Sequence, residues 1–160
     1  MKVFGSKRSI KNTISLEYQY LSDSDKNAAE NLAKSGHYRQ ACYFLLQAIE
    51  KTVRAKIFTL VDGNNKYFRD KNRTHSISDA IDFLIEIISK NDPVISAQHK
   101  HNFYSYVLGD LNYQQIHNNL RYPWFSEGKN SFYVLDIHEG DYIQLSDNLK
   151  KLENYLKDFY

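Results

Sequence analysis

The sequence predicts an all-α protein, an up-and-down bundle of about five helices with one long central helix. One observation is the stretch 38–60, which has apolar residues at helical spacing and contains neither Pro nor Gly. A second is that the same three-and-four spacing returns in later stretches of the chain. A third is that only one short run, 132–137, has the β-branched and aromatic composition of an extended segment.

The stretch 38–60 is the expected central helix. It is long enough, at about six turns, to cross a small domain, and turn residues follow it at 62–65. One face is apolar, and its residues are Tyr38, Ala41, Cys42, Leu45, Ala48, Ile49, Thr52, Val53, Ile57 and Leu60. The opposite, polar face contains Glu50 and Arg54, an i,i+4 pair expected to contribute only a few tenths of a kcal/mol.

The helix before it is expected to begin at Ser22 rather than within 13–21. Asp25 follows Ser22 by three residues, as in a capping box. An alanine-rich stripe then runs to Gly36, immediately before the central helix. A connection this short predicts that the two helices pack as an antiparallel hairpin.

After the central helix, residues 62–74 are expected to form a loop, and Ser76 is expected to cap a third helix. Asp79 lies three residues after Ser76, and apolar residues continue at helical spacing to Ile88. The sequence Asn-Asp-Pro at 91–93 should stop this helix.

A fourth helix is expected over 96–120, although Gly109 lies inside it. Pro123 should end it. Several polar side chains occupy its expected buried turns, and we expect them to line a wet groove or a polar interface. They are Asn112, Gln114, Gln115, His117 and Asn118.

The extended segment 132–137 precedes a last helix, marked by Leu145, Leu149, Leu152, Leu156 and Phe159. Residues 1–160 are expected to form a single domain, with 1–12 as a flexible arm. The chain has no apolar run near the ~20 residues that span a bilayer, and its first residues lack the apolar region of a signal peptide. A cytoplasmic protein without membrane contact is therefore expected.

Composition excludes several classes of function. The net charge of +2 is too small to indicate nucleic-acid binding by itself. A single cysteine, Cys42, excludes an internal disulfide and a cysteine-rich zinc site, and its place on the apolar face predicts a buried thiol. His99 and His101 diverge on a helix, so we expect no metal site and no cofactor there.

Two clusters of side chains could bind an anion. The first precedes the third helix and consists of Arg69, Arg73 and His75. Cations beside a helix N-terminus suit an anion, but His75 could equally pack at the helix entrance while the arginines are solvated.

The second cluster closes the fourth helix and consists of His117, Asn118, Arg121 and Tyr122. His117 and Arg121 share a helix face. Arg121 could clamp a phosphate, His117 could move a proton, and Tyr122 could stack on a base. Alternatively, Arg121 only binds the last carbonyls of its helix while Tyr122 and Pro123 pack as a corner.

Three motifs resemble the HEPN domain family. Residues 28–58 are similar to the first helical hairpin of that family, including Gln-Ala-Ile-Glu-Lys at 47–51. Thr-His at 74–75 resembles the pair before its third helix, and Arg-Tyr-Pro at 121–123 resembles the motif after its fourth.

The resemblance implies a helical bundle, often dimeric, that accompanies a minimal nucleotidyltransferase in toxin–antitoxin or defence modules. Some members bind nucleotides, and others are metal-independent ribonucleases with Arg, four to six residues, then His. No His follows Arg121 at that spacing, since the next is His138. Arg69 and His75 have the spacing, but they precede the third helix, where the family does not place its active site.

The first hypothesis is therefore a binding module for a nucleotide or for a nucleotidyltransferase partner. The second is a ribonuclease that acts on RNA with a variant site, for which His117 and Arg121 are the catalytic candidates. The third is a structural adaptor. A homodimer is expected because 13 Tyr and nine Phe exceed the need of one small core and because symmetric dimers are the commonest oligomers.

Overall fold

The computed structural model describes residues 4–10 and 13–159. Its helices confirm the predicted all-α class. They are α1 (Ile14–Lys34), α2 (Tyr38–Leu60), α3 (Lys66–Lys71), α4 (Ile77–Ser89), α5 (Pro93–His101), α6 (Tyr113–Arg121) and α7 (Glu139–Leu156). A π-helical turn spans Asn102–Val107, and two short strands, β1 (Trp124–Ser126) and β2 (Ser131–Tyr133), flank a 3₁₀ turn at Glu127–Lys129.

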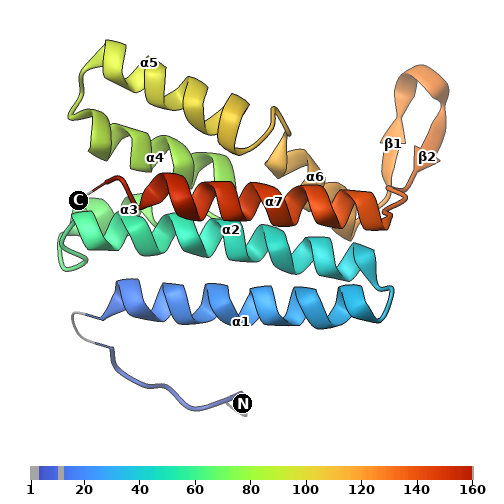
Figure 1. Cartoon of the computed structure of the whole chain (residues 1–160), viewed down its shortest axis with the longest axis horizontal. Coiled ribbons are helices and arrows are strands. Elements are labelled where there is room, and N and C mark those ends of the chain that lie inside the picture. The colour runs from blue at the N-terminus through green and yellow to red at the C-terminus, as the bar shows by residue number, and fades with distance from the viewer. Residues whose placement is uncertain (1–3, 11–12, 160) are drawn as a thin grey trace.

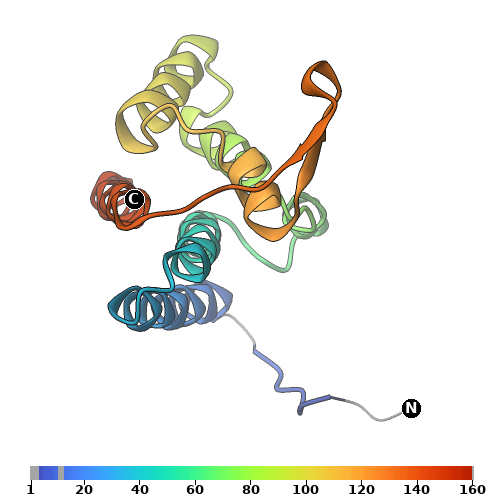
Figure 2. The same cartoon turned by 90° about the vertical axis from the view of Figure 1, so that its right-hand side faces the viewer.

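Helix α2 lies at the centre of the bundle, between α1 on one side and α4 and α7 on the others (Figures 1 and 2). It begins and ends at the predicted residues, and it contains more buried residues than any other helix of the described chain. Leu45 and Ile49 are in the core, as expected. Cys42 is also buried, and this burial raises the pKa of its thiol to about 12, so the thiol is protonated at neutral pH.

A glycine turn joins α1 to α2 and confirms the predicted hairpin. Gly36 has φ +78°, a left-handed conformation that favours glycine. Its amide donates to Ala33 at 2.9 Å and the amide of His37 donates to Leu32 at 2.8 Å, the paired bonds of a Schellman motif. This motif ends α1 and returns the chain along α2.

The prediction that α1 begins at Ser22 is wrong, because the helix begins at Ile14. Ser22 lies in its interior and is fully buried against α2. Its hydroxyl donates to the carbonyl of Ala48 at 3.0 Å and lies 2.8 Å from the hydroxyl of Thr52. The Ser22 hydroxyl therefore forms its hydrogen bonds with α2 and does not cap a helix.

Residues 62–74 are not all loop, since they contain the short helix α3. Asn65 caps it by accepting from the amide of Tyr67 at 2.9 Å. The next prediction is confirmed: Ser76 caps α4 and accepts from the amide of Asp79 at 3.2 Å.

The single fourth helix expected over 96–120 is instead two helices, α5 and α6, separated by a break. Gly109 and Asp110 have φ of +67° and +56°, which no α-helix contains. The buried Asn148 of α7 donates to the carbonyl of Leu108 at 3.1 Å, so the break has a partner for its backbone. Asn112 caps α6 by accepting from the amide of Gln115 at 3.0 Å.

Pro123 follows the end of α6, as predicted, and an antiparallel hairpin comes next. Its register pairs Trp124 with Tyr133 and Phe125 with Phe132. Strand β2 overlaps the predicted extended segment only at residues 132–133, and β1 was not expected. The hairpin projects beyond the helices at the α6 end of the bundle (Figures 1 and 2).

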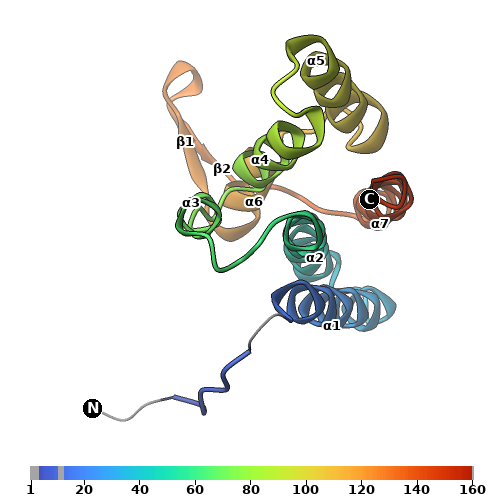
Figure 3. The same ribbon diagram turned by 90° about the vertical axis from the view of Figure 1, so that its left-hand side faces the viewer.

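The predicted arm, 1–12, lies partly outside the described residues. Residues 4–10 are exposed and have neither helix nor strand, and they run away from the bundle (Figure 3). In the described part of the chain, no helix is both long and apolar enough to cross a membrane.

Candidate functional site

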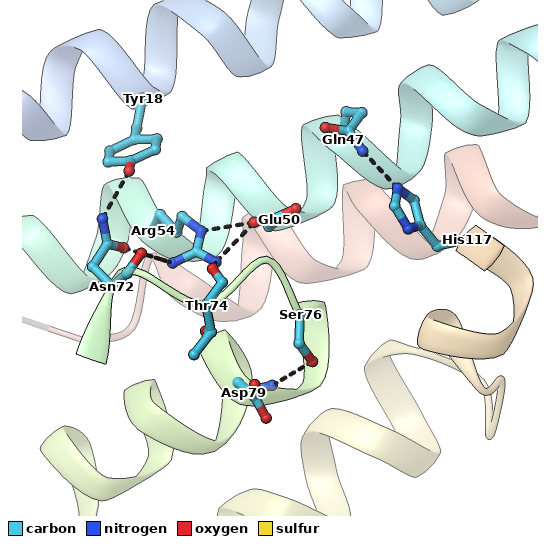
Figure 4. A network of polar contacts seen from close by, with 9 residues as sticks. All are labelled: Tyr18, Gln47, Glu50, Arg54, Asn72, Thr74, Ser76, Asp79 and His117. Atoms are coloured by element: carbon cyan, nitrogen blue, oxygen red, sulfur yellow. Dashed lines mark hydrogen bonds and ion pairs between the residues drawn. The ribbon is translucent and has the colours of Figure 1, made fainter. Parts of the chain in front are cut away.

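His117 lies on the inner side of α6 and faces the polar edge of α2 (Figure 4). Its ring stacks on Tyr43 with the centroids 5.5 Å apart and the planes 17° from parallel. Its Nε2 lies 2.9 Å from Nε2 of Gln47. The imidazole is therefore held in one orientation by two side chains of the central helix.

The electrostatic setting favours the neutral form of His117. Burial is the largest cause that lowers the pKa of its imidazole, and the positive charge of Arg121 lowers it further, whereas Glu50 acts in the opposite direction. The amide nitrogen of Gln47 can only donate, so Nε2 of the ring accepts and the ring proton lies on Nδ1. A neutral ring in this state offers a hydrogen-bond donor rather than a free base.

Arg121 and Tyr122 lie at the C-terminal end of α6 and are both exposed. The guanidinium lies over the ring of Tyr122, 5.0 Å from its centroid, and Nη2 donates to the Tyr122 hydroxyl at 3.0 Å. No acidic side chain of the described residues pairs with Arg121. Most of its donors face solvent, beside an aromatic ring and close enough to His117 to affect its pKa. Asn118 is exposed as well.

A second arginine, Arg39 of α2, fixes the position of this helix end. It donates to the carbonyl of Leu135 at 2.6 Å and to that of Asn119 at 3.1 Å. The end of α6 and the segment that leaves the hairpin are thereby tied to the central helix. Sequence reasoning missed this clamp because its acceptors are backbone carbonyls, which no residue type reveals.

The first predicted cluster does not join the second. His75 is exposed, Arg73 pairs with Asp70 at 3.5 Å, and Arg69 donates to the carbonyl of Asn64. Among the described residues, no hydrogen bond or ion pair connects Arg73 or His75 to α6. The two candidate anion sites are therefore separate, and the arginines of the first already have partners in their own segment.

Arg54, which the sequence places on the polar face of the central helix, is buried. Its side chain is only 4% exposed. It binds Glu50 at 2.8 Å, the side chain and carbonyl of Asn72, and the carbonyl of Thr74 (Figure 4). Asn72 in turn donates to the hydroxyl of Tyr18 at 2.8 Å. This network sets the path of residues 72–76, and the only sequence signal for it was the Glu50–Arg54 spacing.

Two further polar side chains lie on α5 and α6. Oε1 of Gln114 is buried and has no partner within the described chain. Nδ1 of His99 lies 3.0 Å from the hydroxyl of Tyr155, and burial lowers the pKa of the imidazole. The described residues contain no group of His, Cys, Asp and Glu side chains placed to hold a metal ion.

The hairpin of α1 and α2, covered by α4 and α7, places the chain in the class of all-helical bundle domains. A more specific assignment comes from the HEPN domain model, which matches residues 22–100 and supports the HEPN family. No curated protein and no solved structure matches it. Arg73 and His75 lie within the matched residues, whereas His117 and Arg121 lie beyond them.

Proposed function

We propose that the chain is a nucleotide-binding module and that Arg121 anchors a phosphate of the ligand. The observation that supports this most is the exposed guanidinium of Arg121, which lies over Tyr122 and has no acidic partner among the described residues. A guanidinium can hold a phosphate by two parallel hydrogen bonds. Tyr122 offers a ring on which a base can stack.

His117 contributes to this site as an orienting donor rather than as a base. Its lowered pKa keeps the imidazole neutral, and Gln47 occupies its acceptor nitrogen. A general base needs a free acceptor within reach of the proton that it removes. We therefore favour binding over RNA cleavage as the function of this site.

Calorimetric titration with nucleoside mono- and triphosphates tests the proposal. The wild type should bind, Arg121→Lys should bind more weakly because an ammonium cannot form the planar fork, and Arg121→Ala should bind least. Arg73→Ala is the matched control, since Arg73 is also an exposed arginine but pairs with Asp70. Equal binding by all four proteins would contradict the role of Arg121.

We further propose that the module works in the cytoplasm with a minimal nucleotidyltransferase, as in toxin–antitoxin or defence systems. Support for this comes from the HEPN match at 22–100 and from the helical bundle. Co-expression with a small nucleotidyltransferase encoded beside this chain should yield a complex that co-purifies. A nucleotidyltransferase that elutes separately at micromolar concentrations would contradict the partnership.

A further inference from the structure

The imidazole of His117 has one nitrogen engaged and one nitrogen open. Nε2 lies 2.9 Å from Nε2 of Gln47, whereas no hydrogen bond within the described residues uses Nδ1. His117 is only half-buried, and Arg121 lies about one helical turn further along α6, close enough to act on the charge of the ring. What Nδ1 can offer a ligand at this place depends on which nitrogen carries the ring proton.

Two residues of α2 hold this ring from one side. Tyr43 and Gln47 are four residues apart, so their side chains lie on the same face of the helix. Tyr43 stacks on the imidazole, with the centroids 5.5 Å apart, and this contact restricts the plane of the ring. Gln47 meets the edge of the ring at Nε2. Stacking alone suits either tautomer, so the amide of Gln47 decides which nitrogen is protonated.

The carboxylate of Glu50 favours the charged form of His117, but this carboxylate is bound by another side chain. Arg54 donates to Oε1 of Glu50 from Nε at 2.9 Å, and its Nη2 lies 2.8 Å from the same oxygen (Figure 4). This pairing offsets much of the negative charge. Burial and Arg121 both lower the pKa of the imidazole and together outweigh Glu50. The neutral ring has a single N–H proton, and a neighbouring amide can fix its position.

We propose that Gln47 is a positioning residue that keeps the ring proton of His117 on Nδ1 and thereby makes the site select a hydrogen-bond acceptor, such as a phosphate oxygen. This rests on the proposed binding of a phosphate by Arg121. The Nδ1–H group and the guanidinium then donate to the same anion. Because the donor belongs to the neutral ring, it persists at pH values where an imidazolium would have lost its charge. The opposite tautomer would turn a lone pair toward the anion and repel it.

Nitrogen-15 NMR of the His117 ring, without ligand and at about pH 8, where the ring is neutral, tests the tautomer. Nδ1 should carry the proton in the wild type. Gln47→Glu should move the proton to Nε2, because a carboxylate only accepts, and should raise the pKa of the ring. Gln47→Met, which removes the amide and adds no charge, should give a mixture of tautomers. Gln40→Glu is the matched control, since it adds the same charge at an exposed position of α2 and should leave the tautomer unchanged.

Calorimetric titration with the methyl ester of a nucleoside 5′-monophosphate tests the consequence for binding, because this phosphodiester does not titrate in the histidine range. At about pH 8, Gln47→Glu should bind about three- to tenfold more weakly than the wild type and than Gln40→Glu. At about pH 6 the ring of Gln47→Glu is charged and both its nitrogens donate, so most of the loss should be recovered. Circular dichroism should show the same helix content in all these proteins.

The ligand-free spectra and the titrations fail in different ways. A proton on Nε2 in the wild type, or a tautomer that Gln47→Glu leaves unchanged, would overturn the role of Gln47. Equal affinities of Gln47→Glu and Gln40→Glu at about pH 8 would do the same. A wild type that has the expected tautomer but does not bind the phosphodiester would overturn the selection of an acceptor together with the proposed function, and the ligand-free spectra distinguish this result from a failure of Gln47 to set the tautomer.

Discussion

Nη1 of Arg54 donates to the side-chain oxygen of Asn72 at 2.6 Å, across 18 residues of sequence. The bond joins the buried core of α2 to the segment that leads into α4. Because Asn72 also binds Tyr18 of α1, one guanidinium couples three parts of the bundle. These partners satisfy a guanidinium that is almost closed to solvent.

Arg54→Ala should lower the free energy of unfolding by about 3–5 kcal/mol, because it leaves the largely buried carboxylate of Glu50 without its partner. Urea denaturation monitored by circular dichroism measures this change. Arg54→Lys should also destabilise, since an ammonium cannot reach Glu50, Asn72 and Thr74 at once. The control is Lys66→Ala, which removes an ion pair whose lysine is 81% exposed and should cost less than about 1 kcal/mol. Similar losses for Lys66→Ala and Arg54→Ala would contradict the structural role of Arg54.

Leu45→Ala should cost about 2–5 kcal/mol of unfolding free energy, because Leu45 is only 3% exposed and its loss leaves a cavity. The comparison is Leu16→Ala on α1, where the side chain is 70% exposed and the cost should be within about 0.5 kcal/mol. Denaturant titration of both variants checks the result. Equal costs would mean that α2 does not form the core as described.

Gly36→Ala should destabilise by about 1–2 kcal/mol, because alanine is strained at φ +78°. A Cβ at this position would meet no atom within 4 Å, so the cost comes from the backbone alone. Gly140→Ala is the matched control. A Cβ at Gly140 would also meet no atom within 4 Å, but this residue lies in α7 and has no positive φ. The substitution should therefore raise the free energy of unfolding by about 0.4–1 kcal/mol. Thermal unfolding of the two variants should shift the midpoint in opposite directions.

The sequence predicted α2, α4 and the α1–α2 hairpin well because their signals are local. Periodic apolar residues, Ser76 as a cap and Gly36 as a turn each act within a few residues. The break at Gly109 could not be predicted in this way. It depends on Asn148, which is 40 residues away and supplies the hydrogen bond that the interrupted helix has lost.

The candidate site was predicted only in part. The spacing of His117 and Arg121 placed both at the end of one helix, and the structure confirms that position. The partners of His117 come from α2, 70 residues earlier for Gln47, so its orientation and protonation depend on packing. The same is true of Arg39, whose acceptors are carbonyls of Asn119 and Leu135.

The pKa of His117 should lie below the usual histidine value, because burial and Arg121 disfavour the charged ring. The unfolded chain then binds a proton at higher pH than the folded one. His117 therefore reduces stability as pH falls through the usual histidine range, and it has no such effect above that range. Ring-proton NMR over a pH series measures the pKa, and Arg121→Gln should raise it. An unchanged pKa in Arg121→Gln would show that the two groups do not interact.

The most direct test of nucleotide binding at the end of α6 is an NMR titration of the wild type with a nucleoside monophosphate. The proposal predicts saturable shifts confined to the amides of residues 118–124 and to the His117 ring. These shifts should disappear in Arg121→Ala, while the rest of the spectrum stays the same. Shifts centred on Arg73 and His75, or no saturable shifts, would contradict the account.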